Sequence, residues 1–143
     1  MRSVRNLLAI LATILALVVV VPSALASTPH TLTIGKECSQ FTGKIPSFCT
    51  ITSSNVTAIP VASKVWYYGP VVGSSVFLSS TAIINDGKGN TATGYCQVDN
   101  HTGVGLCMFW KGTGRLTGFH ALIHGSGTFA DYHWDGTYYF SGR

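Results

Sequence analysis

Four cysteines in two equally spaced pairs constrain the fold of this chain more than any other feature. The pairs are Cys38 with Cys49 and Cys96 with Cys107, and each pair is eleven residues apart. Each interval carries turn-forming residues near its midpoint, at 43–44 and at 99–103. Two strands joined by such a turn would place the cysteines opposite one another, within the roughly 5.5 Å Cα separation that a disulfide tolerates. The spacing therefore predicts one disulfide within each pair.

The N-terminus has the organisation of a cleavable secretory signal. Arg2 and Arg5 precede an apolar run over 7–21, and small residues at Ala24 and Ala26 follow it. At roughly 1.5 Å per residue, this run falls short of the roughly 30 Å hydrocarbon layer, which leaves an uncleaved anchor as the poorer alternative. We predict a signal peptide over 1–26, a disordered lead-in over 27–35, and one domain over 36–143. The product is expected to be secreted into an oxidising compartment, with no membrane association after cleavage.

Charge and motif content exclude several function classes. After residue 26 the chain carries seven basic and five acidic side chains, scattered singly, for a net charge of +2. No basic patch results, so nucleic-acid binding lacks its main electrostatic basis. The cysteines do not form the short Cys-x-x-Cys knuckles of a zinc site. We predict no metal, no cofactor and no catalytic residue.

Short segments rich in β-branched and aromatic residues make up the rest of the chain. Glycine interrupts them every eight to twelve positions, and no stretch carries apolar residues at helical spacing over a dozen residues. Eight strands are expected, over 47–52, 56–61, 64–71, 75–85, 90–98, 104–111, 115–124 and 131–140. Short segments rich in Gly, Asn, Asp and Ser, which are typical of turns, separate several of these strands. This pattern is typical of an all-β sandwich or barrel.

Glycines, paired cysteines and a closing aromatic strand follow a distinctive order between 72 and 140. The segments are GNTATGYC at 89–96, GLC at 105–107, GTGRLTGF at 112–119 and WDGTYYF at 134–140. This order resembles the allene oxide cyclase and dirigent-like β-barrel superfamily, in particular its short secreted bacterial members. The resemblance implies a single closed antiparallel barrel of about eight strands with an apolar interior, often dimeric or trimeric. Enzymes of that superfamily use buried carboxylates and polar residues, but Glu37 is the only glutamate here, and no active-site residue is carried over.

Histidines and aspartates near the C-terminus form the one polar cluster with side chains suited to catalysis or metal binding. His120 and His124 share a strand face, and a hairpin to the following strand would bring His124 near Asp131. Such a group could bind a metal or transfer protons. However, four residues along a strand span about 13 Å, too far for one ion to take both imidazoles, and His and Asp are common at solvent-facing strand positions.

Aromatic side chains are the other candidates for ligand binding. Alternation along a strand prevents Tyr67 from sharing a face with Trp66 and Tyr68, so some rings must face outward or line a cavity. The predicted ligand-binding residues are His120, His124, His133, Asp131, Tyr67 and Trp110.

These observations predict a secreted, non-enzymatic β-barrel that binds a small apolar ligand or a partner surface, such as an extracellular protein or a second copy. The alternatives are an isomerase or cyclase like allene oxide cyclase, and an envelope-associated structural or effector domain. An interior pocket of several hundred Å³ lined by His120 or other polar tips would favour ligand binding or catalysis. A filled interior with an exposed aromatic strip would favour protein contact.

Overall fold

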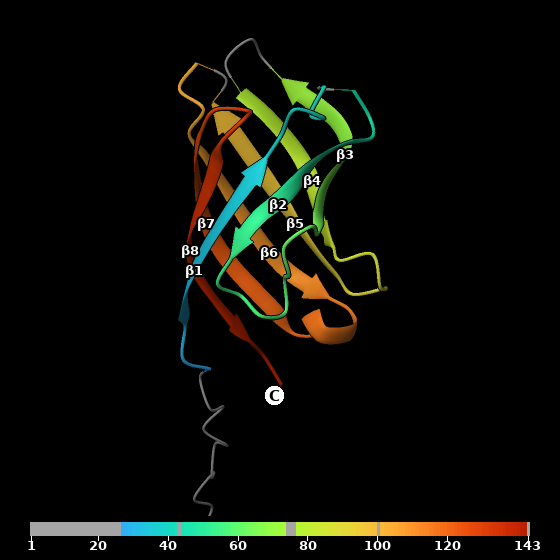
Figure 1. Cartoon of the computed structure of the whole chain (residues 1–143), viewed down its shortest axis with the longest axis vertical. Helices are drawn as coiled ribbons and strands as arrows, with labels where there is room; N and C mark the ends of the chain where they lie inside the picture. Colours follow the sequence, from blue (N-terminus) through green and yellow to red (C-terminus); the bar gives the residue numbers. More distant parts are fainter. Residues whose placement is uncertain (1–26, 43, 74–76, 100, 143) are drawn as a thin grey trace, which may run out of the picture.

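The chain forms one closed antiparallel β-barrel (Figure 1). The computed structural model describes residues 27–42, 44–73, 77–99 and 101–142, so the expected signal peptide lies outside the described residues. The eight strands are β1 (His30–Glu37), β2 (Ser47–Ser54), β3 (Lys64–Gly73), β4 (Phe77–Asn85), β5 (Thr91–Asp99), β6 (Gly105–Gly112), β7 (Phe119–Gly127) and β8 (Tyr132–Phe140). Each strand pairs with its neighbours in sequence, and β1 pairs with β8 to close the barrel. The all-β barrel class is confirmed.

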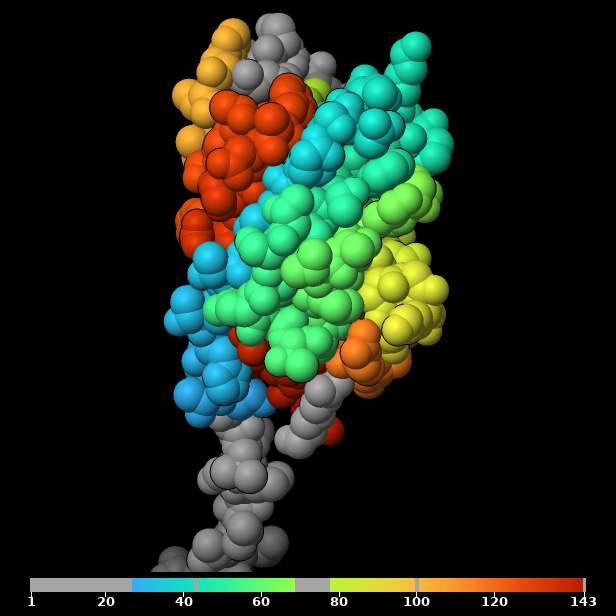
Figure 2. Space-filling view, in the orientation of Figure 1, coloured from blue at the N-terminus to red at the C-terminus, as the bar shows by residue number. Residues whose placement is uncertain are grey.

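The barrel has two distinct ends because its strands run alternately up and down. The β1–β2, β5–β6 and β7–β8 connections lie at the upper end in Figure 1, and the β2–β3, β4–β5 and β6–β7 connections lie at the lower end with the end of β8. Figure 2 shows β1, β2 and residues 64–68 of β3 side by side on the visible face. No helix among the described residues is long and apolar enough to cross a bilayer.

The lead-in expected over 27–35 is instead, from His30 onward, the strand that closes the barrel. Ile34 pairs with Trp134 of β8 on one side and with Ser54 of β2 on the other. Leu32 and Ile34 point inward and are fully buried. The prediction was wrong because two apolar side chains are too few to identify a strand, whereas pairing on both edges makes their burial sufficient.

The strand expected over 56–61 is a loop that plugs the lower end. Val56 and Ile59 are buried there, and the Ile59 N–H donates to the Val56 carbonyl at 2.8 Å. Ala62 then takes a positive φ of 70°, which an extended strand does not contain. The expected strand over 115–124 also differs, because a 3₁₀ turn, η1 (Gly114–Leu116), precedes β7. One strand gained and one lost keep the total at eight.

Both predicted disulfides are present. Cys96 and Cys107 are direct cross-strand partners in β5 and β6, with Cα atoms 4.1 Å apart. Cys38 follows β1 and bonds Cys49 of β2, with Cα atoms 4.2 Å apart. All four are buried inside the barrel. Two such bonds are characteristic of an oxidising environment.

A polar cluster at the lower end joins the β4–β5 turn to η1. The Asp86 carboxylate accepts hydrogen bonds from the Arg115 guanidinium at 2.6 Å, the Asn90 side chain at 2.7 Å and the Lys88 N–H at 2.8 Å. The Asp86 side chain is only 1% exposed. Burial alone would raise its pKa, but these hydrogen bonds outweigh burial and lower the pKa of Asp86 to about 2.

Replacing Asp86 with asparagine is therefore expected to destabilise the protein by about 1–2 kcal/mol at pH 7. The pKa of Asp86 in the folded state is lower than the usual 3.9 or so of an unfolded chain. Its contribution is therefore present above about pH 4 and is lost as the pH falls toward 2. Urea unfolding of Asp86→Asn and the parent should show a difference that shrinks over this range. Asp131→Asn, at an exposed rim position, is the control, and an equal difference at pH 7 and pH 2 would contradict the expectation.

Candidate functional site

A cavity of about 410 Å³ occupies the upper end of the barrel. Below it the interior is filled by large side chains, among them Trp134, Phe119 and Phe109. The cavity lining is mainly apolar and includes both disulfides. At the mouth, Phe41 of the β1–β2 connection stacks on Phe129 of the β7–β8 connection, with ring centroids 6.0 Å apart.

Paired glycines make room for an aromatic ring in the wall of the cavity. Gly105 of β6 and Gly125 of β7 are cross-strand partners, and both are buried. A Cβ atom added at Gly125 would lie 2.7 Å from the Tyr132 hydroxyl oxygen. The Tyr132 ring therefore occupies space that an inward side chain at this position would fill.

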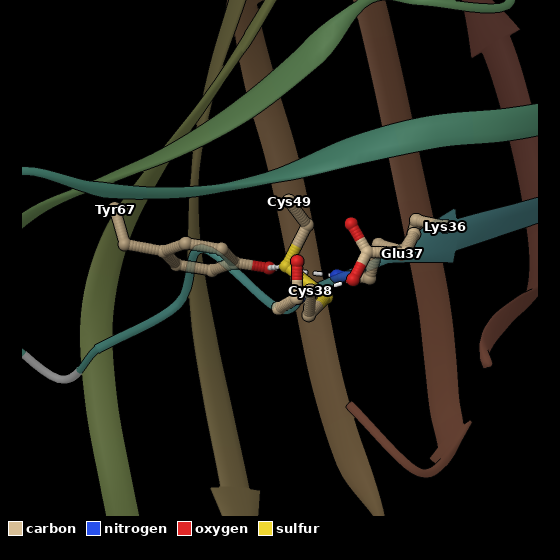
Figure 3. The surroundings of a disulfide bond; sticks show 6 residues. Lys36, Glu37, Cys38, Cys49 and Tyr67 are labelled. Atoms are coloured by element: carbon tan, nitrogen blue, oxygen red, sulfur yellow. Dashed lines mark hydrogen bonds between the residues drawn. A yellow bond between two sulfur atoms is a disulfide. The ribbon is translucent and has the colours of Figure 1, made fainter. Parts of the chain in front are cut away.

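A buried lysine stands at the end of an otherwise apolar inward row. Leu32, Ile34, Lys36 and Cys38 alternate into the interior, and Lys36 is only 2% exposed. Its Nζ donates a hydrogen bond to the Tyr67 hydroxyl at 2.7 Å. Figure 3 shows these two side chains pointing toward one another beside the disulfide that Cys38 forms.

Three aromatic rings surround the Lys36 amine. Its Nζ lies 3.8 Å from the ring centroid of Trp134, 4.9 Å from that of Tyr132 and 5.4 Å from that of Tyr67. The faces of these rings stabilise a cation, although less than water would. In the part of the chain that the structure describes, no carboxylate forms an ion pair with Lys36. Burial lowers the pKa of Lys36 well below its ordinary value, because no counter-ion offsets the lost hydration.

Two tyrosine hydroxyls complete the polar part of the wall. Burial, and secondly the proximity of Tyr132, raise the pKa of Tyr67 above its ordinary value. Burial raises the pKa of Tyr132 to about 12. The Tyr132 hydroxyl is fully buried and has no hydrogen-bond partner among the described residues. Both hydroxyls therefore keep their protons at neutral pH, and neither supplies a negative charge to the cavity wall.

Of the six predicted ligand-binding residues, only Tyr67 lines the cavity. The other five are on the outer surface: Trp110 on β6, His120 and His124 on β7, His133 on β8, and Asp131 beside it at the upper rim. Apolar residues or glycine occupy the inward positions on these strands, so the polar side chains lie on the solvent side.

The expected contact between His124 and Asp131 does not form. In the β7–β8 ladder His124 lies opposite Asp135, while Asp131 lies 3.1 Å from His133. His120 stacks on Tyr139 instead, with ring centroids 4.8 Å apart. The described residues contain no group of three or more His, Cys, Asp or Glu side chains placed to hold a metal.

An exposed apolar strip crosses the outer face of β5, β6 and β7. Tyr95, Met108 and Leu122 are cross-strand neighbours there, and Trp110 lies two residues beyond Met108. The barrel therefore has an interior cavity, which favours ligand binding, and also an exposed apolar strip, which favours protein contact.

Lys36 and Tyr132 are the functional candidates that the sequence prediction missed. A signal for Lys36 was present, because Leu32, Ile34, Lys36 and Cys38 follow the two-residue period of a strand. Tyr132 also lines the cavity, but a buried hydroxyl without a partner among the described residues has no sequence signature.

Comparisons of the chain with protein-family models, with curated proteins and with solved structures found no match. The resemblance to the allene oxide cyclase and dirigent-like superfamily stays a prediction. Functional conclusions therefore depend on the geometry of the cavity.

Proposed function

We propose that this protein is secreted and binds a small, mainly apolar ligand in the cavity at the upper end of its barrel. The observation that carries the proposal is an apolar cavity of about 410 Å³ with a few polar groups in its wall. Ligand-binding pockets typically measure roughly 300–1,000 Å³ and have this composition.

The shape of the interior supports this function. An eight-stranded barrel is just wide enough to be filled by its own side chains or to hold one small ligand. Here the lower end is plugged by Val56 and Ile59, while the upper end is lined by glycines and small or aromatic side chains. The disulfides fix the wall on two sides of the cavity. The cavity is therefore built into the fold, which lowers the ordering cost of binding.

Holding a ligand is better supported than the cyclase alternative. Asp99 is the only carboxylate residue among the described residues that line the cavity. Its Oδ1 accepts hydrogen bonds from the N–H groups of His101, at 2.7 Å, and Thr102, at 3.2 Å. This carboxylate stabilises the β5–β6 turn, so it is not the buried acid or base that the resemblance implies.

Trp134 provides a direct test of binding. The chain has three tryptophans, and the double variant Trp66→Phe/Trp110→Phe leaves only Trp134, which lines the cavity. Titration of this variant with 1-decanol is expected to change Trp134 fluorescence to saturation at one ligand per chain. Native mass spectrometry of the complex provides the stoichiometry independently.

A matched pair of substitutions locates the bound ligand. Ser80 points into the cavity, whereas Thr81 is exposed on the outer face of β4. In the same background, Ser80→Leu is expected to reduce 1-decanol affinity at least tenfold and Thr81→Leu to leave it unchanged. The proposal fails if no saturable change occurs, or if both variants bind like the parent.

A further inference from the structure

We infer that Lys36 captures apolar aldehydes in the cavity as a reversible imine. This inference rests on the proposed function, because the aldehyde must first enter the cavity. It is carried by the placement of one amine: buried in the cavity wall, enclosed by three rings, and without a carboxylate partner among the described residues.

The surroundings of Lys36 favour a nucleophilic amine. A lysine held as a structural cation in a protein interior is normally paired with a carboxylate. Here the groups that face Nζ are Tyr67 of β3 and Tyr132 and Trp134 of β8, while the adjacent cysteines are joined in a disulfide. None of these supplies a negative charge at neutral pH. The lowered pKa of Lys36 is consistent with this arrangement, and desolvation in an apolar pocket is a known way to activate a lysine.

The reaction requires only the amine and the aldehyde. The lone pair on Nζ forms a bond to the carbonyl carbon while the carbonyl oxygen takes up a proton, and the amine loses one. The carbinolamine then loses its hydroxyl group and the remaining Nζ proton as water, leaving a carbon–nitrogen double bond. The only by-product is one molecule of water, and no oxidant or reductant takes part.

Two features of the wall suit these steps. The Tyr67 hydroxyl lines the cavity and is 2.7 Å from Nζ, so it is able to bond the oxygen that arrives with the aldehyde. The Trp134 ring, 3.8 Å from Nζ, would stabilise a protonated imine as it stabilises an ammonium. The apolar lining favours an aldehyde with a hydrocarbon body over a hydrophilic one.

Lys64 is an internal comparator for this chemistry. Its Nζ lies 4.1 Å from the Phe48 ring centroid and 5.5 Å from that of Trp66, so it also has aromatic neighbours. Unlike Lys36 it is partly exposed and does not line the cavity. Lys88 and Lys111 are fully on the surface. Comparing Lys36 with Lys64 therefore separates the effect of burial on amine reactivity from the effect of aromatic contact.

The test is trapping of the imine with decanal and cyanoborohydride at pH 7, followed by peptide mapping of the intact disulfide-bonded protein. Decyl groups are expected at Lys36 at least ten times faster than at Lys64, Lys88 or Lys111. Excess 1-decanol should suppress trapping at Lys36 alone, because it competes for the cavity. Lys36→Met should remove the fast-reacting site, and Lys64→Met should leave it unchanged.

The outcomes separate this inference from the proposed function. If 1-decanol binds but Lys36 reacts no faster than Lys64, the imine inference is overturned and ligand binding stands. If 1-decanol does not bind and Lys36 is not preferred, both fail. The peptide map of the parent protein decides the question even if Lys36→Met does not fold.

Discussion

Replacing Trp134 with alanine is expected to destabilise the protein by about 3–5 kcal/mol, the usual range for loss of a large buried aromatic side chain. Trp134 is 1% exposed and is the largest of the fully buried side chains. Its ring packs against Phe109, with centroids 5.7 Å apart, and lies under the Lys36 amine. The substitution would extend the cavity into the filled part of the barrel, and the surrounding strands cannot close over it without breaking their ladders.

Urea unfolding measures this effect, and two other tryptophan substitutions calibrate it. Trp134→Phe keeps a ring in the same place and should retain most of the stability. Trp110→Ala removes a tryptophan that is 51% exposed, so its effect should stay within about 0.5 kcal/mol of the parent. If Trp134→Ala were no more destabilising than Trp110→Ala, the packed floor of the cavity described above would be wrong.

Removing either disulfide is expected to cost about 2–3 kcal/mol, because both bonds close loops of the same length in the unfolded chain. Double alanine substitutions are suitable, since all four sulfur atoms are in an apolar interior where serine would add an unsatisfied hydroxyl. Equal loop lengths make the two variants a matched pair. Any difference between them must come from the folded state.

That difference should appear in ligand binding. Cys96 and Cys107 are embedded in the β5–β6 ladder, whose hydrogen bonds keep the wall in place without the sulfur bridge. Cys38 lies beyond the end of β1 and begins the connection that carries Phe41 to the mouth of the cavity. Loss of the Cys38–Cys49 bond should therefore lower 1-decanol affinity severalfold more than loss of Cys96–Cys107. Fluorescence titration of both variants checks this, and equal affinities would show that the bridge does not shape the mouth.

Short-range patterns predicted much of the wall of this barrel. The disulfides followed from spacing and turn chemistry, and alternation correctly separated Tyr67 from Trp66 and Tyr68. Both kinds of inference depend on neighbours in sequence. Each strand edge in a hairpin is matched by a segment a few residues away, so the local sequence contains enough information.

Long-range closure was not predictable in the same way. His30–Glu37 is a strand only because β8, about a hundred residues later, supplies its second edge. Assigning 27–35 to a lead-in separated Lys36 from the inward row to which it belongs, and beside Glu37 it resembled an ordinary surface charge. The histidines were conspicuous in the sequence, and alternation shows which residues share a face with them. It does not show which face of the sheet the barrel encloses, so the sequence could not show that the histidines lie outside.

Pairing between β1 and β8 has a consequence for biogenesis. The first strand to be made cannot complete its hydrogen bonding until the last one has been synthesised, so a chain stopped before 132 presents two open edges instead of a sealed cylinder. Such edges template aggregation. Truncated products should consequently be lost to proteolysis or precipitation rather than persist as partly working molecules.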